Sequence, residues 1–501
     1  MIKQRISVFL VFLLFFFQIP AFAQNTAGRA EVFPRINPEQ KALDFFRSNP
    51  RDYSWKELAK ISLWASSGNV AESHLQQILG IAEAIRTSPQ LPSGDRERAE
   101  FVLEFMHRNL LRVYSLHQTR VDTMLTNGRF NCVSSSALYM ILAKSIGLNL
   151  SGVMTRDHAF VMIHIDGENI DVETTNIHGF DPGNRREFHD AFGRITGFVY
   201  VPPLNYRDRQ TIAPIELVSL ILTNRIAELE SRNRFAEAIP LAIDRAALLN
   251  GSSLTASGNV NSPASIFPDP YMVVLDRLFN YGAFLLRSRR EEESLRWAAY
   301  TLAVFPYEDR WSELNLAAVN NRINRFVQAN QITEAKAFLE NHKNVLSPAD
   351  HTRLETMLID TGLLSRANRI RSAADGDSVA AAIEEARINQ SISDARANEL
   401  LTFTIQRTAS ILSAAPGRDW VAAINYIEGA IERFGSNREL ERILQNYRNN
   451  RAVDFHNRFA AAWNRRNFDE AIRILDEGLS YFPDDRQLLR NRETVERANN
   501  R

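Results

Sequence analysis

The sequence predicts an α+β N-terminal domain followed by an all-α C-terminal solenoid. The first part begins with helical patterns and becomes strand-rich after about residue 153, where a hairpin signal also occurs. From about residue 212 onward the hydrophobic pattern is helical almost throughout, and a short helix-start motif recurs there. We therefore expect an α+β domain with N-terminal helices at 24–205 and a solenoid at 212–501.

The composition indicates an ordinary folded protein and excludes several kinds of partner. Of the 501 residues, 45% are hydrophobic and 24% are charged, which is the balance of a water-soluble globular chain. The 59 Lys and Arg residues equal the 59 Asp and Glu residues, so no nucleic-acid partner is expected. The sequence has no glycine-rich phosphate loop, no nucleotide fingerprint and no His-Glu-x-x-His, so we expect no cofactor and no metal site.

The first 23 residues have the pattern of a secretory signal peptide. Lys3 and Arg5 precede an almost wholly apolar run of twelve residues at 6–17, and Ala-Phe-Ala at 21–23 fits a cleavage site. Twelve residues of helix span about 18 Å, which is short of the ~30 Å hydrocarbon core of a bilayer. We expect removal of residues 1–23 and export to the periplasm or the medium, with no membrane span left. The alternative is an uncleaved anchor.

Helix signals and strand signals follow each other in the first part. A helix is predicted to begin at Asp95, and another runs from 131 to 146 and ends at Gly147, where a left-handed residue closes a helix. The strand-rich segment 153–175 contains Asp-Gly at 166–167, the signal of a two-residue hairpin turn. A short strand at 197–201 and the Pro-Pro pair that follows it then mark the end of the domain.

Cys132 is the only cysteine of the chain, and it lies at the start of the helix 131–146. Asn131 is a good N-cap, so Cys132 falls in the first turn, where free amides and the helix dipole stabilise a thiolate. In an oxidising compartment this thiol has no disulfide partner in its own chain. A buried structural cysteine is one interpretation and a nucleophile is the other, and the position at the helix start favours the nucleophile.

A thiol nucleophile needs a base, and His158 is the best placed histidine. His158 opens the expected strand 158–165, directly after a loop. His164 shares its face of the strand, but six residues of extended chain separate the two by about 20 Å, so they cannot serve one site. His164 lies beside the hairpin turn, where solvent exposure explains it.

The acid that orients the base is either Glu173 or Asp171. If Asp166 and Gly167 form the two-residue turn, the two residue numbers of each cross-strand pair sum to 333. His158 then lies opposite Thr175 and diagonal to Glu173. Asp171 falls further away. A shifted register or a bulge would bring Asp171 nearer, so both residues remain candidates.

The order of these pieces resembles the transglutaminase-like superfamily. The matching residues are Asn131-Cys132 with its helix, Asp157-His158-Ala159-Phe160, and the segment 171–175. The resemblance implies a papain-like fold, in which the cysteine helix packs on an antiparallel sheet, and a Cys-His-acid triad that acts on amides.

Two details of the resemblance bear on the chemistry. The family pattern at the acid is Val-Asp-Pro-Thr, which Val172-Glu173-Thr174-Thr175 fits with Glu in place of Asp, while Ile170-Asp171 fits a variant that ends in Ile-Asp. Crosslinking transglutaminases usually carry Trp where this chain has Val133, which leaves hydrolysis or a binding role open.

The chemistry that these residues predict passes through an acyl-enzyme. Cys132 attacks an amide or ester carbonyl, its backbone N–H is a natural donor to the oxyanion, and His158 passes a proton to the leaving amine. Water or a second amine then resolves the acyl-enzyme. Gln118, Asn127 and Asn131 are candidates for a second oxyanion donor. The polar loop 176–183 either rims the site or only connects two elements.

A degenerate motif recurs in the helical part. Its clearest copy is Asn-Phe-Asp-Glu-Ala-Ile at 467–472, with similar or weaker copies at 234–239, 292–295, 332–335, 379–383 and 419–424. The motif resembles tetratricopeptide repeats, in which a small residue lets two antiparallel helices approach. The irregular spacing leaves a non-repetitive helical bundle as the alternative.

Two functions remain open at this point. The first is an exported thiol enzyme, an amidohydrolase or acyltransferase with a peptide or protein substrate, whose helical repeats bind a protein partner. The alternative is a catalytically silent scaffold that only recognises a peptide and in which the solenoid carries the function. The pairing of Cys132 with His158 favours the enzyme.

Overall fold

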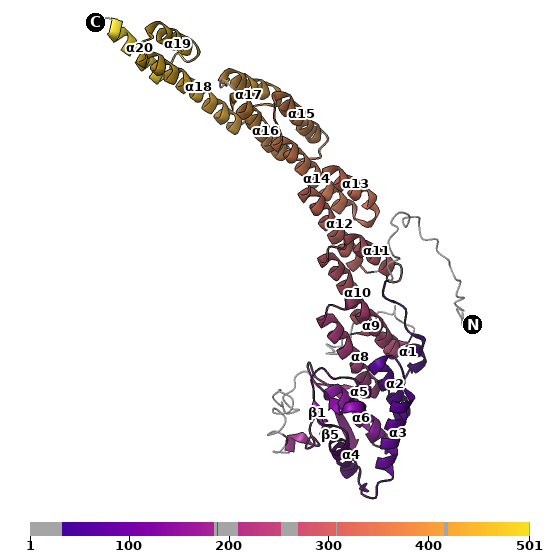
Figure 1. The fold of residues 1–501 in the computed structure, drawn as a ribbon. Coiled ribbons are helices and arrows are strands. Elements are labelled where there is room, and N and C mark those ends of the chain that lie inside the picture. Colours follow the sequence, from indigo (N-terminus) through magenta and orange to yellow (C-terminus); the bar gives the residue numbers. More distant parts are fainter. Residues whose placement is uncertain are drawn as a thin grey trace, which may run out of the picture. The chain divides into compact units, whose positions relative to one another are not determined.

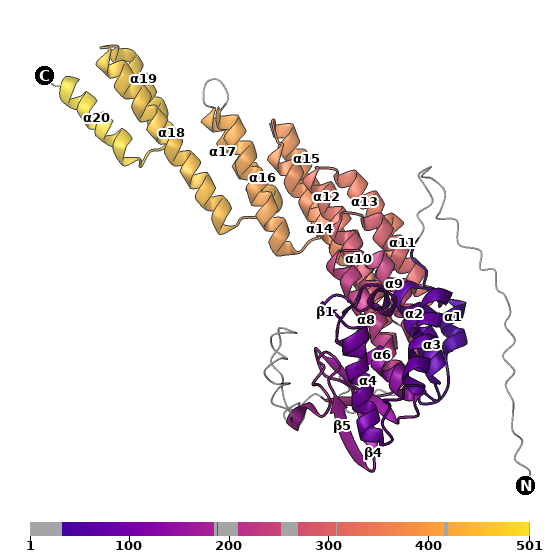
Figure 2. The same cartoon turned by 60° about the horizontal axis from the view of Figure 1, so that its bottom comes forward.

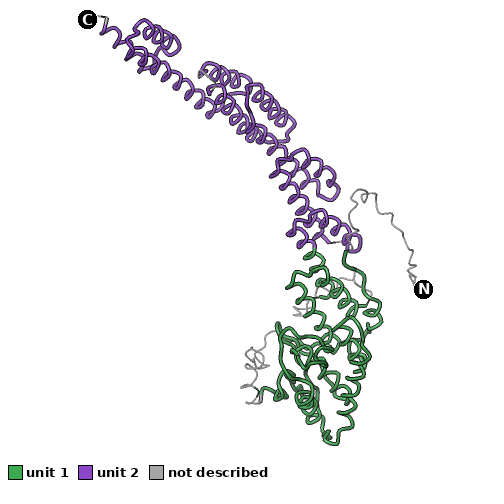
Figure 3. Tube along the Cα trace, viewed as in Figure 1, with its two compact units in different colours: residues 1–281 green, residues 282–501 purple. Residues whose placement is uncertain are grey.

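The computed structural model describes residues 33–184, 188, 209–251, 269–306, 308–414 and 419–499. The chain forms two compact units, residues 1–281 and residues 282–501 (Figure 3), and each is described by itself. The expected signal peptide, the expected strand at 197–201 and the Pro-Pro pair after it lie outside the described residues.

Unit 1 combines helices with a small sheet (Figure 1, Figure 2). The described helices are α1 Gln40–Phe45, α2 Trp55–Ser67, α3 Glu72–Arg86, α4 Asp95–Asn109, α5 Val121–Asn127, α6 Cys132–Ser145, the 3₁₀ turn Pro182–Asn184, α8 Pro214–Ser231 and α9 Phe235–Asn250, and α10 Pro270–Arg287 crosses the boundary between the units. The described strands are β1 Val113–Tyr114, β2 Arg129–Phe130, β3 Leu150–Met154, β4 Ala159–Ile165, β5 Glu168–Val172 and β6 Gln210–Ile212. Strands β1 and β2 pair in parallel, and the other four form an antiparallel sheet in the order β5-β4-β3-β6.

The ends of α6 form as the sequence predicts. The side chain of Asn131 accepts hydrogen bonds from the backbone N–H groups of Val133 and Ser134, and Ser134 in turn accepts from the Asn131 N–H. Such a reciprocal cap satisfies amides that the first helical turn leaves free. Gly147 follows the helix with a left-handed φ of 86°. Local sequence therefore determines where the cysteine helix starts.

The hairpin of β4 and β5 also has the predicted register. Val161 pairs with Val172 and Met162 with Asp171, so the paired numbers add up to 333. Asp166 and Gly167 have φ values of 50° and 86°, the left-handed pair that a type I′ turn requires. The register puts the residues before β4 and after β5 at the same end of the hairpin.

Helix α6 lies at the centre of unit 1. Every residue from Cys132 to Ala143 is buried, because α2, α3, α4, α5, α8 and strands β3 and β4 all contact this helix. Residues of β4 alternate between the two faces of the sheet: Val161 and Ile163 belong to the main core, while Phe160 and Met162 join a separate small cluster. The sheet thus presents one face to the cysteine helix.

Helices α8 and α9 belong to the core of unit 1, although the sequence assigns them to the solenoid. Ile215, Leu217 and Val218 of α8 share the main hydrophobic core with α6, and α9 packs on α1. The compact units divide between Tyr281 and Gly282, later than the 205–212 boundary that the sequence predicts. A helical pattern shows that a segment is a helix, but it does not show on which domain the helix packs.

Unit 2 consists of helices in all of its regular elements that the structure describes (Figure 1). They are α11 Glu291–Leu302, α12 Arg310–Gln328, α13 Ile332–Asn341, the 3₁₀ turn Lys343–Val345, α14 Pro348–Asn368, α15 Ala373–Ile388, α16 Asp394–Ala414, α17 Trp420–Phe434, α18 Arg438–Asn464, α19 Phe468–Tyr481 and α20 Arg486–Asn499. Each helix contacts the next one in sequence, and α12, α14, α16, α18 and α20 also contact one another in series. Helical hairpins that stack in this way are typical of repeat proteins.

The predicted motifs mark the second helices of these hairpins. The copies begin α11, α13, α17 and α19 of unit 2 and α9 of unit 1, whereas the copy at 379–383 lies inside α15. Each of these helices carries a buried small residue, such as Ala335, Ala423 or Ala471. Four of them follow the same turn: Asn233, Arg289, Asn330 and Arg466 have φ near 60°, and the next N–H returns to the carbonyl five residues earlier. The recurrence of one turn supports helical repeats over an irregular bundle.

No helix in the described part of the chain is both long enough and apolar enough to span a membrane.

Candidate functional site

The thiol of Cys132 lies at the first residue of α6 and is 8% exposed. The side-chain cap of Asn131 serves the amides of Val133 and Ser134 but not that of Cys132. Within the described residues the Cys132 backbone N–H therefore has no acceptor, as is usual at the first helical position. Sulfur and a free amide donor thus occur on one residue.

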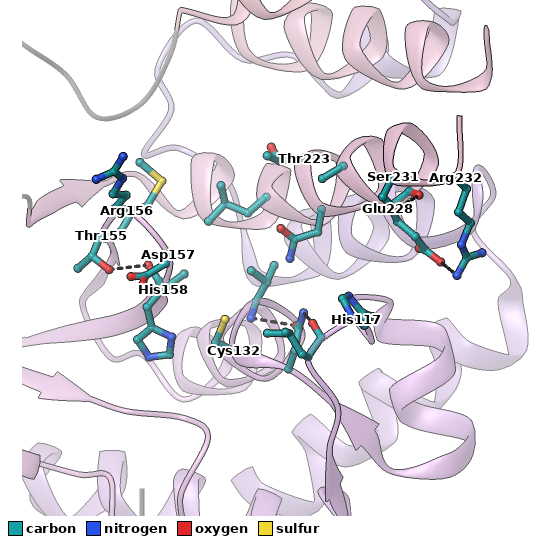
Figure 4. A pocket seen from close by; sticks show the side chains of 18 residues that line it. His117, Cys132, Thr155, Arg156, Asp157, His158, Thr223, Glu228, Ser231 and Arg232 are labelled. Atoms are coloured by element: carbon teal, nitrogen blue, oxygen red, sulfur yellow. Dashed lines mark hydrogen bonds and ion pairs between the residues drawn. The ribbon is translucent and has the colours of Figure 1, made fainter. Parts of the chain in front are cut away.

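His158 links Cys132 to Glu173. The Nε2 atom of His158 lies 2.5 Å from Oε2 of Glu173, and the imidazole also interacts with the Cys132 thiol, which helps to raise the pKa of the ring. Because Glu173 occupies Nε2, Nδ1 is the ring nitrogen that remains for the sulfur. Figure 4 shows Cys132 and His158 beside each other on one side of a cavity.

The Glu173 carboxylate is almost fully buried, and all of its contacts hold it in one orientation. Its second oxygen, Oε1, accepts hydrogen bonds from the Thr175 N–H at 3.2 Å and from the Thr175 hydroxyl at 2.7 Å. A buried carboxylate needs such donors, because an unpaired charge in the interior is costly. The carboxylate therefore fixes the orientation of His158 and accepts the proton on Nε2.

The charge of this group favours an imidazolium. Burial opposes the charged ring, but the Glu173 carboxylate and the hydrogen bonds to Cys132 and Glu173 outweigh it, so the pKa of His158 lies well above its usual value of 6.5. A protonated His158 next to sulfur stabilises a thiolate and holds a proton ready for a leaving group.

Asp171, the other acid candidate, does not reach His158. Its two carboxylate oxygens accept hydrogen bonds from the Arg209 guanidinium at 2.5 and 2.7 Å, which is a bidentate ion pair. His164 is equally remote: its ring bonds to Ser151 and Asn169. The structure thus brings Glu173 to the histidine, and it leaves Asp171 and His164 outside the site.

A second layer of polar groups holds the segment that carries Glu173. The Thr174 hydroxyl lies 2.8 Å from the hydroxyls of both Ser135 and Ser136 on α6, and the Thr174 carbonyl accepts a hydrogen bond from His107 on α4 at 3.1 Å. Burial lowers the pKa of His107 to about 4, so this ring is neutral and Nε2 carries the donated proton. Sequence patterns did not indicate these partners.

The loop 176–183 supports the site from behind and does not line the cavity. The Glu173 N–H donates to the Gly179 carbonyl at 2.7 Å, and Val172 pairs with Phe180. A Cβ atom on Gly179 would meet the Glu173 carbonyl oxygen at 1.9 Å, so only glycine fits this close approach. Of the two interpretations of this loop, the connection agrees with the structure.

The three amide side chains considered as oxyanion donors have structural roles. Gln118 donates to the carbonyls of residues 120 and 129, Asn131 donates to the carbonyl of Leu116, and Asn127 accepts from a backbone N–H. Gln118 and Asn127 are not among the residues that line the cavity, whereas Asn131 is, so a second oxyanion donor stays a prediction.

Tyr114 is a further polar group near the sulfur that the sequence did not indicate. Its hydroxyl is buried and has no hydrogen-bond partner among the described residues, and its ring lies edge-on to Phe130. Burial, followed by the negative charges of Cys132 and Glu173, raises the pKa of Tyr114 far above 10. The hydroxyl is therefore a neutral donor.

The thiol and the imidazole open into a cavity of about 580 Å³ (Figure 4). Its walls come from 116–117, the start of α6 at 131–133, the loop and strand start at 154–159, and one face of α8 from Leu220 to Ser231, with Arg232 directly after the helix. In the part of the chain that the structure describes, no group of three or more His, Cys, Asp or Glu residues is arranged to hold a metal ion.

Comparison with known proteins adds little to this geometry. No protein-family model matches the chain, and no curated protein matches it. Among solved structures, a chain from a structure of Naa15/Naa10 bound to HypK-THB is similar over 87% of this chain and 54% of that chain, at 12% identity and a TM-score of 0.16. This chain thus spans about half the length of that neighbour. A score this low carries no argument about fold or function, and the transglutaminase-like resemblance remains an interpretation of the residues themselves.

Proposed function

We propose that this chain is a thiol enzyme of the transglutaminase-like type, an amidohydrolase or acyltransferase that acts on a peptide or protein after export. Cys132 is the nucleophile, His158 the acid and base, and Glu173 the residue that orients the histidine. The observation that carries the proposal is the sequence of neighbouring groups from thiol through imidazole to a buried carboxylate, of which Cys132 and His158 line a cavity.

The first half of the reaction forms an acyl-enzyme. The Cys132 thiolate attacks the carbonyl carbon, so a C–S bond forms and the carbonyl electron pair moves to the oxygen. The backbone N–H of Cys132 lies where it can donate to this oxyanion. His158 then gives its Nδ1 proton to the leaving nitrogen, the C–N bond breaks, and the amine leaves.

The second half releases the acyl group. Neutral His158 removes a proton from water or from an amine, which attacks the thioester carbonyl, and the thiol leaves as the anion. Water gives hydrolysis, and an amine gives acyl transfer. Val133 in place of the Trp of crosslinking transglutaminases favours hydrolysis.

A scaffold without catalysis is the second candidate. The stacked hairpins of unit 2 favour it, because repeat arrays present extended surfaces for protein partners. In this case Cys132 would be a packing residue of α6, which is the usual fate of a buried free cysteine.

Alkylation at low pH distinguishes the two candidates. A free thiol with a pKa near 8.5 is almost fully protonated at pH 6, whereas a thiolate–imidazolium pair keeps Cys132 reactive toward iodoacetamide. His158→Ala should slow this reaction by about 10- to 100-fold, while His164→Ala, a histidine on the same hairpin but outside the site, should not change it. Slow labelling of the unaltered protein, unchanged in His158→Ala, would reject the enzyme and support the scaffold.

A further inference from the structure

We propose that the cavity beside Cys132 is a groove for an extended peptide segment of about five residues, with helix α8 as the wall that selects it. This inference rests on the proposed function and adds the form of its substrate.

The length of the lining points to an extended ligand. The lining residues of α8 and of its C-cap, Arg232, follow one another at alternating intervals of three residues and one residue: Leu220, Thr223, Asn224, Ala227, Glu228, Ser231 and Arg232. This periodicity describes a single face of the helix, and twelve residues of helix extend over about 18 Å. An extended chain rises about 3.4 Å per residue, so about five residues fit along this wall. A compact ligand would need less of the helix.

The side chains of the wall leave room for a polypeptide backbone. Thr223, Ala227 and Ser231 are small, exposed and spaced four residues apart. Between them, the Asn224 Nδ2 donates to the Thr119 hydroxyl at 3.2 Å, which leaves Oδ1 as an acceptor for a peptide N–H. A main chain can therefore approach closely and still find a hydrogen-bond partner.

The charges of the groove balance each other. Glu228 and Arg232 form an ion pair at 2.9 Å at one end, and Arg156 and Asp157 stand beside His158 at the other (Figure 4). Such a surface does not select a polyanion. None of the described lining residues is Phe, Tyr or Trp, whereas sugar rings bind on aromatic platforms, so a peptide fits better than a polysaccharide.

The wall is firmly held relative to the thiol. Leu217, Val218 and Ile221 of α8 are buried in the same core as α6, and the lining residue Leu220 belongs to that core too. Because α8 and α6 share this core, a larger side chain at an exposed wall position narrows the groove rather than displacing the helix.

Labelling with reagents of increasing length tests the groove in the full chain. Randomised peptidyl chloromethyl ketones of one, three, five and seven residues are compared with iodoacetamide, with Cys132 modification followed by mass spectrometry. The rate should rise with length and level off at about five residues. Ala227→Trp should slow the pentapeptide reagent at least about tenfold and leave iodoacetamide within about twofold.

Two variants sharpen this test. Ser231→Trp, at the end of the groove near Arg232, should slow the five- and seven-residue reagents but not the shortest ones. Ala84→Trp makes the same alanine change at an exposed site on α3, outside the cavity, and should alter none of the rates.

The outcomes separate the groove from the proposed function. Slow iodoacetamide labelling of the unaltered protein at pH 6 would reject the thiol enzyme itself. Fast iodoacetamide labelling, with peptide rates that are independent of length and of Ala227→Trp, would overturn the groove alone. Protection of Cys132 by oligosaccharides but not by peptides would assign the groove to a different class of ligand and would also overturn the proposal.

Discussion

Helices that enclose α6 in unit 1 come from distant parts of the chain, whereas each helix of unit 2 contacts mainly its neighbours in sequence. Helix α2 packs on α8, with about 150 residues between them, and both contact α6. In unit 2 the contacts run from each helix to the next and to the next but one. Unit 1 should therefore unfold as a whole, while unit 2 can lose order hairpin by hairpin.

The buried polar groups differ in the same way. Around the thiol, Ser135 joins the Asn131 carbonyl to the Thr174 hydroxyl, and the adjacent Glu173 joins Thr175 to His158. In unit 2 the buried polar residues bond either within one helix, as Thr301 and Thr408 do, or to a single adjacent helix, as Glu291 does to Arg325. A site of linked polar groups needs several segments in place at once, and a stack of hairpins does not.

The largest expected effect is the loss of unit 1 when the chain ends at the predicted boundary. A fragment of residues 24–205 lacks α8, which buries Ile215, Leu217, Val218, Ile221 and Leu222. At about 1.5–3 kcal/mol for each side chain, this loss is comparable to the whole stability of a domain. Circular dichroism and urea titration should show that 24–205 does not fold.

The matched fragment, residues 24–281, should unfold cooperatively and keep the alkylation rate of Cys132. If both fragments fold equally well, α8 is not part of unit 1, and the comparison between the two units is wrong at this boundary.

The next largest difference is expected between the two acids, Asp171 in β5 and Glu173 directly after it. Glu173→Gln keeps the shape but loses the charge that orients and stabilises protonated His158, so peptide turnover should fall by about 10³-fold or more. Asp171→Asn breaks the ion pair with Arg209, which costs stability but leaves the triad intact. Its turnover should stay within about threefold of the unaltered protein. The reverse order of effects would transfer the orienting role to Asp171.

The stability of the protein should depend on pH because His107 takes up a proton on unfolding. Burial lowers its pKa to about 4, while the unfolded chain binds this proton below about 6.5, so the unfolded state holds more protons between these values. Stability therefore falls as the pH decreases from 6.5 to 4.

His107→Gln retains a donor for the Thr174 carbonyl without titrating. Between pH 7 and 4.5 the unaltered protein should lose about 2–3 kcal/mol more than this variant in urea unfolding. Parallel profiles would show that His107 does not bind a proton on unfolding.

The smallest expected effect is a change in the stability of unit 2, which two glycine-to-alanine substitutions test as a matched pair. A Cβ atom at Gly376 would meet the Thr408 hydroxyl at 2.2 Å and the Tyr426 hydroxyl at 2.8 Å, whereas one at Gly429 would meet nothing within 4 Å. Gly376→Ala should cost about 1–2 kcal/mol, and Gly429→Ala should gain up to about 1 kcal/mol from helix propensity.

Hydrogen exchange should confine both glycine effects to α15, α16, α17 and their neighbours. Neither change should alter Cys132 alkylation. An altered thiol rate in Gly376→Ala would show that the two units are coupled.

The sequence alone was sufficient where neighbouring residues decide the structure. The Asn131 cap, the end of α6 at Gly147, the register of the β4–β5 hairpin and the starts of the repeat motifs all depend on contacts within a few residues. The register arithmetic of the hairpin also favoured Glu173 over Asp171 as the neighbour of His158, although both stayed candidates. The pairing of His158 with Cys132 came from the helix-start position of the cysteine and the family resemblance. Whether these residues are catalytic remains a prediction.

Contacts between segments that are far apart in the sequence were decided only by the tertiary structure. It assigned Asp171 to Arg209, set α8 against unit 1 and beside the thiol, and left the Tyr114 hydroxyl without a partner among the described residues. A hydrophobic period shows which face of a helix is buried, but many surfaces can bury it equally well. The choice among them depends on the packing of the whole unit, which no local pattern in the sequence contains.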